Sequence, residues 1–390
     1  MRNLLWVGDA ACPSGFARVT HSVLETLRQH FNVTVLALNY RGDPHDYPYP
    51  IYAAAAGGDS HGVMRLNWMC DKTQPDVIVI QQDPWNMPSY LQALKRLPEH
   101  ARIPVVGVTP VDGKNCNGTA LNGLALNIFL TQFGLDEAYA GGYKGLSCVI
   151  QHGIDHAPFR PLDNKSLVRE RTFGTSQLND AFVIGNVNRN QPRKRFDLLL
   201  RYFAEWLKTS KAEDAWLFLH VAPTGDMGVD LRALGKYYGI IERLALREPP
   251  TFYGIEDESL VDTYNSMDVL ANTTQGEGWG LTVMEAMACG VPVIAPDWSA
   301  LGEWAKDAAL LVPCTSTAVG PPYLGVIGGV PDEVLFVKAL DELYQSKETR
   351  AGYAKKGLDL VGDERFTWAH VGKLFLNAIN SVAKKEEIAA

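Results

Sequence analysis

Residues Thr274–Gly290 combine closely spaced glycines with two carboxylates, and they follow an apolar run at Val269–Asn272. Three glycines lie one residue apart in the turn: Gly276, Gly278 and Gly280. Glycine lets the backbone approach a ligand closely, and a helix is expected to begin near Leu281 and Thr282. A strand, a glycine-rich turn and a helix N-terminus offer free N–H groups and the positive end of the helix dipole to an anion. The segment therefore predicts a phosphate site.

The two carboxylates of this segment suit a different part of a ligand. Glu277 lies in the turn, and Glu285 lies about one turn into the expected helix. A phosphate would repel both, so they are better placed to accept hydrogen bonds from sugar hydroxyls. Trp279 belongs to the same turn and is counted with the ligand-binding residues. On periodicity alone, an ordinary strand-to-helix turn with two surface glutamates is the alternative.

A second candidate site is the basic segment Gly185–Asp197, which follows the apolar run Phe182–Val187. Its four cations fall within seven residues: Arg189, Arg193, Lys194 and Arg195. An arginine fork and a compact lysine charge suit a pyrophosphate. Charge runs are often solvated turns, but this one lies at the carboxyl end of a strand, where a doubly wound sheet places its ligand. We therefore expect a diphosphate to bind here.

A loop near the start of the chain is a further candidate. The loop Gly8–Val19 joins a strand to a helix, and Gly15 and Arg18 are its candidate ligand-binding residues. A plain loop in which Ser14 caps the helix is the alternative.

Acidic residues end two other apolar runs of the first half. Asp112 follows Val105–Val108 and Asp83 follows Val77–Ile80. Either carboxylate could orient or deprotonate an acceptor hydroxyl. A role as helix cap or turn residue is the alternative for each.

Short apolar runs alternate with segments of helical period through most of the chain, which predicts βαβ units and parallel sheets. Expected strands in the first half are Leu4–Val7, Val33–Leu38, Val77–Ile80, Val105–Val108, Ile128–Leu130 and Cys148–Ile150. Expected strands in the second half are Phe182–Val187, Trp216–His220, Thr251–Tyr253, Val269–Asn272, Val291–Ala295 and Leu310–Val312. The expected fold class is α/β, with two doubly wound, Rossmann-like domains facing a central cleft. The Gly- and Pro-rich stretch Thr315–Val330 is expected to be a surface loop.

Composition limits the domain count and the class of protein. A chain of 390 residues suits two domains, which we place at residues 1–160 and 181–369, with a polar connection at 161–180. The net charge of −8 argues against a surface-wide basic field for nucleic acid. The six cysteines show no metal-binding spacing and are expected to be reduced in a cytoplasmic protein. No run approaches the about 18 apolar residues of a membrane span.

The setting Gly-Glu-Gly-x-Gly-x-x-x-x-Glu-Ala-Met-Ala-Cys-Gly-Val-Pro-Val around Glu277 and Glu285 resembles the signature of the retaining GT-B glycosyltransferases of family 4, the glycosyl transferases group 1. The resemblance implies that Glu277 faces the donor sugar and that Glu285 holds the ribose hydroxyls. It implies that Arg189 and Lys194, five residues apart, bind the donor diphosphate. It also implies that Gly15 lies across the cleft, and that a final helix at about 370–390 returns to the first domain.

The sequence departs from this pattern at two positions. Arg195 replaces the usual glycine after the lysine and is expected to add a further charge. Val111 stands where relatives often carry a histidine before Asp112, which puts a family-style histidine role in doubt.

The expected reaction moves a sugar from a nucleoside diphosphate to an acceptor hydroxyl, with retention and without a metal or other cofactor. Arg189 and Lys194 would stabilise the leaving group, and no Asp-x-Asp motif is present. The acceptor is open: a saccharide, a lipid-linked saccharide, a small molecule, a protein or a modified nucleic-acid base. The alternatives are a glycogen-type phosphorylase or synthase of the same shape, and a non-catalytic protein that binds sugar nucleotides. A dinucleotide-dependent enzyme is disfavoured because no G-x-G-x-x-G follows the first strand.

Overall fold

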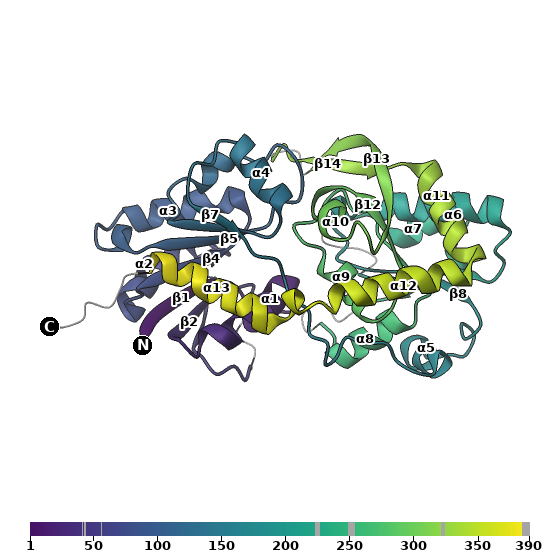
Figure 1. Cartoon of the computed structure of the whole chain (residues 1–390), viewed down its shortest axis with the longest axis horizontal. Helices are drawn as coiled ribbons and strands as arrows, with labels where there is room; N and C mark the ends of the chain where they lie inside the picture. The colour runs from purple at the N-terminus through teal and green to yellow at the C-terminus, as the bar shows by residue number, and fades with distance from the viewer. Residues whose placement is uncertain are drawn as a thin grey trace. The chain divides into compact units, whose positions relative to one another are not determined.

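The computed structural model describes residues 1–40, 42, 44–55, 57–222, 227–248, 254–320 and 324–383, and the chain divides into two compact units. Unit 1 contains Met1–Val111, Asn115–Gly153 and the residues from Glu364 onward. Unit 2 contains Asp112–Lys114 and Ile154–Asp363. The segment 161–180, expected to be a connection, thus lies within unit 2. Figure 1 shows that each unit is a sheet covered by helices.

Unit 1 is built on a seven-stranded parallel sheet with the order β3-β2-β1-β4-β5-β6-β7. Its strands are β1 (Arg2–Asp9), β2 (Phe31–Leu38), β3 (Ile51–Ala53), β4 (Val77–Gln81), β5 (Val105–Thr109), β6 (Leu126–Phe129) and β7 (Ser147–Val149). Its helices are α1 (Gly15–Leu27), α2 (Val63–Thr73), α3 (Met87–Lys95), α4 (Gln132–Ala140) and α13 (Trp368–Val382). The strand order reverses between β1 and β4, which is where a doubly wound sheet opens a crevice for a ligand.

Unit 2 repeats this plan with the order β10-β9-β8-β11-β12-β13-β14. Its strands are β8 (Phe182–Val187), β9 (Ala215–His220), β10 (Leu244–Arg247), β11 (Val269–Ala271), β12 (Val293–Asp297), β13 (Leu310–Val319) and β14 (Ile327–Pro331). Its helices are α5 (Lys165–Phe173), α6 (Phe196–Ser210), α7 (Leu231–Tyr237), α8 (Asp257–Asn265), α9 (Leu281–Ala288), α10 (Ser299–Trp304), α11 (Glu333–Gln345) and α12 (Lys347–Val361). The sheet is parallel except for the β13–β14 pair. The α/β class with two doubly wound sheets is confirmed.

The central strands form because their apolar runs are buried on both faces, as parallel strands covered by helices require. In unit 2 one face of the sheet packs Ile184, Leu219 and Ala271 into a core cluster with α6 and α11. Because side chains alternate along a strand, the neighbouring residues face the opposite side of the sheet. This alternation decides where the residues beyond the strand ends point.

The expectation of a surface loop at Thr315–Val330 is wrong. The segment supplies most of the β13–β14 hairpin, in which Thr317 pairs with Gly329 and Val319 with Ile327. Its small and polar residues carry little apolar periodicity, because an edge hairpin is held by backbone pairing more than by burial. The expected strand Thr251–Tyr253 lies outside the described residues.

The carboxylate of Asp268 fixes α5 to the sheet of unit 2. Its oxygens lie 2.6 Å from Lys165 Nζ and 2.7 Å from Nη2 of the buried Arg169. The backbone N–H of Val183 donates to the same carboxylate at 2.7 Å. Burial alone would raise the pKa of Asp268, but the two cations and the N–H group hold it below its ordinary value. This network explains why 165–173 belongs to unit 2.

Candidate active site

Two loops of unit 2 meet at the carboxyl ends of neighbouring strands β8 and β11. The backbone N–H of Gln275 donates to Arg193 O at 2.8 Å, and Thr273 Oγ1 donates to Arg195 O at 2.9 Å. The basic loop after β8 and the glycine-rich turn after β11 are therefore one joined structure, at the sheet edge where such folds bind ligands.

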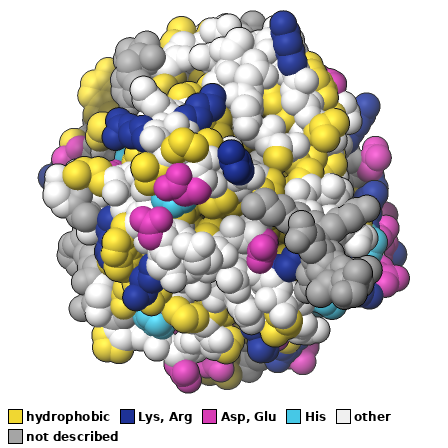
Figure 2. Space-filling view, turned by 90° about the vertical axis from the view of Figure 1, so that its left-hand side faces the viewer, with side chains coloured by type: hydrophobic (Ala, Val, Ile, Leu, Met, Phe, Trp, Pro, Cys, Tyr) yellow, Lys and Arg dark blue, Asp and Glu magenta, His cyan; other side chains and the backbone are white. Residues whose placement is uncertain are grey.

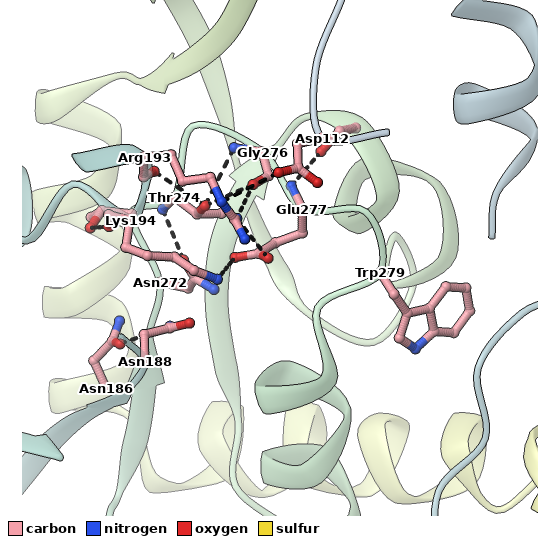
Figure 3. Close-up of polar contacts among 12 residues, drawn as sticks. Asp112, Asn186, Asn188, Arg193, Lys194, Asn272, Thr274, Gly276, Glu277 and Trp279 are labelled. Carbon is pink, nitrogen blue, oxygen red and sulfur yellow. Dashed lines mark hydrogen bonds and ion pairs between the residues drawn. The ribbon is translucent and has the colours of Figure 1, made fainter. Parts of the chain in front are cut away.

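Glu277 lies at the centre of this structure, with cations on both carboxylate oxygens (Figure 3). Lys194 Nζ donates to Oε1 at 2.6 Å, and Arg193 Nη1 donates to Oε2 at 3.1 Å. The Glu277 backbone N–H donates to Ser299 Oγ at 3.0 Å, which fixes the turn. The side chains of Lys194 and Glu277 are both buried.

The two partners of this buried pair shift each other's protonation. Burial would raise the pKa of Glu277, but Lys194 and Arg193 lower it well below its ordinary value. Burial and the neighbouring Arg193 lower the pKa of Lys194, and Glu277 opposes that shift. Glu277 is therefore ionised at neutral pH and serves as the counterion of the two cations.

Arg193 is a residue of this cluster to which sequence reasoning assigned no role. Besides Glu277, it contacts Gly276 O at 3.0 Å through Nη1, and its Nε lies 3.3 Å from Asp112 Oδ2. The expected partner of Lys194 was Arg189, which is exposed in the same loop. Arg193 is brought inward by the single 3-10 turn Pro192–Lys194, a feature that the run of four cations did not reveal.

The charge of Arg195 is already compensated, so the expectation of a further charge for the ligand needs correction. Its guanidinium binds Asp197 through Nε at 2.9 Å and Nη2 at 2.8 Å. Its backbone has a φ of 51° and a ψ of 47°, a left-handed conformation that favours glycine. The family's glycine at this position thus has a backbone explanation.

The loop after β5 contributes Asp112–Lys114 to unit 2. Lys114 and Ile327 exchange two backbone hydrogen bonds of 2.9 and 3.0 Å. A Cβ atom on Gly276 would lie 1.7 Å from Asp112 O, so this approach requires glycine. The Asp112 carboxylate, expected to act on an acceptor hydroxyl, faces Arg193 in this structure.

The helix that follows the glycine-rich turn begins as expected. Gly280 has a φ of 95° and precedes α9, whose first residues Leu281 and Thr282 are partly exposed. Glu285 is buried within α9 and accepts a 2.6 Å hydrogen bond from Tyr264 of α8. Its expected contact with ribose hydroxyls stays a prediction.

Trp279 does not join the polar cluster. Its ring is buried and stacks on Trp304 with centroids 5.0 Å apart, and its Nε1 donates to Met284 Sδ at 3.4 Å. Figure 3 shows the ring pointing away from Lys194 and Glu277. The side chain of Trp279 packs away from the polar cluster and supports the turn. Its pairing with Trp304 could not be predicted from the sequence.

In unit 1, Gly15 is the first residue of α1, and Ser14 caps this helix by accepting a hydrogen bond from the Ala17 N–H. Arg18 lies in the same first turn. Beyond this helix turn, the ring of Tyr47 stacks on that of His21, with centroids 3.6 Å apart. On the face of unit 1 seen in Figure 2, lysine and arginine side chains lie among acidic and uncharged ones.

Within the described ranges, no group of His, Cys, Asp or Glu side chains is arranged to hold a metal ion. No helix there combines the length and apolar character needed to cross a membrane.

The sequence profile of a family described as glycosyl transferases group 1 matches residues 179–319, which contain both joined loops. The match lies within unit 2 and covers less than half of the chain. The D-inositol 3-phosphate glycosyltransferase of Stackebrandtia nassauensis is 28% identical over 242 residues, 60% of this chain and 49% of the relative. The chain thus spans about half the length of this curated relative.

Solved glycosyltransferases share the fold of the whole chain. Anabaena Alr3699/HepE in complex with UDP-glucose superposes with a TM-score of 0.74 at 16% identity, covering 98% of this chain and 100% of HepE. Sucrose-phosphate synthase from Thermosynechococcus elongatus gives 0.74 at 16% identity, covering 97% and 99%. The expected GT-B fold is confirmed.

Proposed function

We propose that this chain transfers a sugar from a nucleoside diphosphate to an acceptor hydroxyl. The observation that carries the proposal is the cluster in which the partly exposed Arg193 joins the buried pair of Lys194 and Glu277, beside the glycine-rich turn. Two cations at a parallel sheet's carboxyl edge, with a helix N-terminus next to them, suit a diphosphate. HepE, which shares the fold, binds UDP-glucose, so UDP-glucose is the first donor to test.

The cluster supplies what departure of a nucleoside diphosphate needs. Negative charge grows on the leaving oxygen as the glycosidic bond breaks, and preorganised cations stabilise it without reorganisation. Lys194 and Arg193 hold that position, and Arg189 belongs to the same loop. Glu277 keeps both cations oriented before the donor arrives, and we assign it to the donor sugar as the resemblance implies.

Three finer features belong to the same proposal. The transfer retains the anomeric configuration, as the family resemblance implies, and needs no metal because the cations of the basic loop stabilise the leaving group. Asp112 is assigned to the acceptor hydroxyl, with its carboxylate released from Arg193 when the donor diphosphate binds that arginine. The six free cysteines suit a reducing compartment, so we place the activity in the cytoplasm.

A thermal-shift panel of UDP, GDP, ADP and their sugars tests the proposal. A ligand at about 100 times its Kd stabilises the folded state by about 2.7 kcal/mol, which moves the melting temperature by a few degrees. We expect one diphosphate and its sugar to stabilise the protein and Lys194→Met to abolish the shift. Lys208→Met is the matched control, because Lys208 is an exposed lysine paired with Glu205 on α6.

Two results would overturn parts of this proposal. If no nucleotide stabilises the folded protein, the donor site is refuted. If a nucleotide sugar binds but no product or hydrolysed donor forms, the non-catalytic alternative holds. NMR of the product's anomeric proton then decides between retention and inversion.

A further inference from the structure

Asn272 is the first residue after β11, and its side-chain amide is only half satisfied. The residue is 1% exposed. Its Oδ1 accepts a 2.8 Å hydrogen bond from the backbone N–H of Thr274. A backbone N–H can only donate, so the amide oxygen must face it and the NH₂ group must point the other way.

The Nδ2 atom of Asn272 is buried and has no hydrogen-bond partner in the described structure. Leaving a buried polar group unsatisfied is costly, so proteins pair nearly all of them. Asn188 in the same site is satisfied, because its Nδ2 donates to Asn186 Oδ1 at 3.0 Å. The unpaired donor of Asn272 is therefore a property of that position and not of asparagines at this sheet edge.

The position of Asn272 places the unpaired donor at the cation cluster. The Thr273 hydroxyl lies 3.4 Å from Lys194 O, so the segment after β11 runs alongside the lysine. Figure 3 draws Asn272 in the same part of the site as Lys194 and Glu277. An amide donor there adds hydrogen-bonding capacity for an anion without adding a charge that Glu277 would neutralise.

A second unsatisfied atom lies on the same face of the sheet. Leu270 pairs with Gly185 and His220 pairs with Val187, so Asn272 and His220 flank Val187. All three face away from the core cluster that contains Ala271 and Leu219. The Nδ1 atom of the buried His220 also has no partner in the part of the chain that the structure describes. Among the described residues, this face therefore carries two buried polar atoms without a hydrogen-bond partner.

We propose that Asn272 donates, through Nδ2, to a phosphate oxygen of the nucleoside diphosphate part of the donor. The inference rests on the proposed function and adds a neutral donor to the cationic cluster. Its hydrogen bond is made equally to the diphosphate alone and to the sugar nucleotide, since it involves no atom of the sugar.

The test measures affinity by titration calorimetry, using whichever of UDP, GDP and ADP stabilises the wild-type protein most. Asn272→Asp keeps the oxygen that caps Thr274 and removes the NH₂ donor, and we expect it to weaken binding at least tenfold. Asn272→Leu removes the donor without adding a charge, and we expect a loss of the same size. Asn188→Asp is the matched control, because it adds a carboxylate at the same site but replaces an amide that has a partner. Thermal unfolding without ligand verifies that each variant is folded.

Each possible outcome has one meaning. Equal affinities of the Asn272 variants and the wild type refute the inference and leave the proposed function standing. An equal loss in Asn188→Asp and Asn272→Asp, with none in Asn272→Leu, shows an effect of charge alone and also refutes it. A loss seen only with the sugar nucleotide assigns Nδ2 to a sugar hydroxyl instead. Failure of every diphosphate to bind the wild type refutes the proposed function itself.

Discussion

Asp9 at the end of β1 in unit 1 and Glu277 in the turn after β11 in unit 2 are both buried carboxylates, but they have different partners. In unit 1, Asp9 accepts hydrogen bonds from Ser14 Oγ at 2.6 Å and Asn39 Nδ2 at 2.9 Å, which are both neutral donors. In unit 2, Glu277 is held by Lys194 and Arg193. A carboxylate with neutral donors holds a loop in one shape. A buried ionic cluster instead keeps cations in place that an incoming anion can bind.

The largest effect we expect is the loss of Glu277 charge. Glu277→Gln leaves Lys194 buried without its counterion, and breaking a buried ion pair costs about 3–5 kcal/mol. The matched change in unit 1, Asp9→Asn, disturbs hydrogen bonds from neutral donors without exposing an unpaired cation, and is expected to cost about 1–2 kcal/mol. Urea unfolding monitored in both units measures the two free energies of unfolding. Equal costs would show that the contrast between the two carboxylates has no energetic meaning.

Acid pH should reduce the stability that the ionic cluster of Glu277 contributes. The pKa of Glu277 is lowered in the folded protein by Lys194 and Arg193, despite burial. The unfolded state therefore takes up the proton first as the pH falls, and the stability that the pair contributes is lost between the ordinary glutamate pKa and the lower folded value. The gap in stability between wild type and Glu277→Gln should be full at pH 7 and shrink below about pH 4.5.

Asp268 provides the check on this pH dependence, because its pKa is also lowered, by Lys165 and Arg169 against burial. The stability of the Glu277→Gln variant should therefore still fall as the pH is lowered, because Asp268 becomes protonated. A gap between wild type and Glu277→Gln that stays constant from pH 7 to pH 3.5 would contradict the ionic description of the cluster.

Arg193 gives a smaller and more specific effect. Arg193→Met removes one cation but leaves the Lys194–Glu277 pair intact, so nucleotide affinity should fall about tenfold, as for one charged hydrogen bond of about 1.4 kcal/mol. Arg189→Met, in the same loop, is the comparison that the family pattern demands. Calorimetry measures which arginine contributes more to nucleotide affinity. If only Arg189→Met lost affinity, the diphosphate would be bound by the predicted pair of Arg189 and Lys194.

Much of this fold follows from apolar runs that a helix-covered parallel sheet must bury on both faces. The central strands β1, β4, β8 and β11 were predicted because each contains an apolar run. The edge strand β3 was not predicted, because three partly buried residues leave no periodic signal. The β13–β14 hairpin was missed for the related reason that its backbone pairing does not depend on apolar residues.

The residue types of the site could be predicted from the sequence, but the directions in which their side chains point could not. Glu277 and Lys194 were found from the chemistry of a glycine-rich turn and a basic loop, and they meet at 2.6 Å. Which of four cations turns inward depends on the turn Pro192–Lys194. Whether Trp279 faces a ligand or the interior depends on Trp304, a residue 25 positions away. Such long-range partners leave no local pattern in a single sequence.

The smallest expected effect concerns Arg195 in the basic loop of unit 2, where the backbone conformation favours glycine. The left-handed conformation of Arg195 destabilises the folded state by about 1 kcal/mol relative to glycine. Its partly exposed ion pair with Asp197 stabilises the folded state by about 0–1 kcal/mol. Arg195→Gly should therefore change the free energy of unfolding by less than about 1 kcal/mol, and should leave nucleotide affinity within about twofold, because the guanidinium is engaged by Asp197. Arg195→Ala, which loses the same pair but keeps the backbone strain, is the matched control and should be less stable than Arg195→Gly. If Arg195→Gly instead weakened nucleotide binding tenfold, the guanidinium would have to leave Asp197 for the ligand, and the cationic cluster would contain a third member.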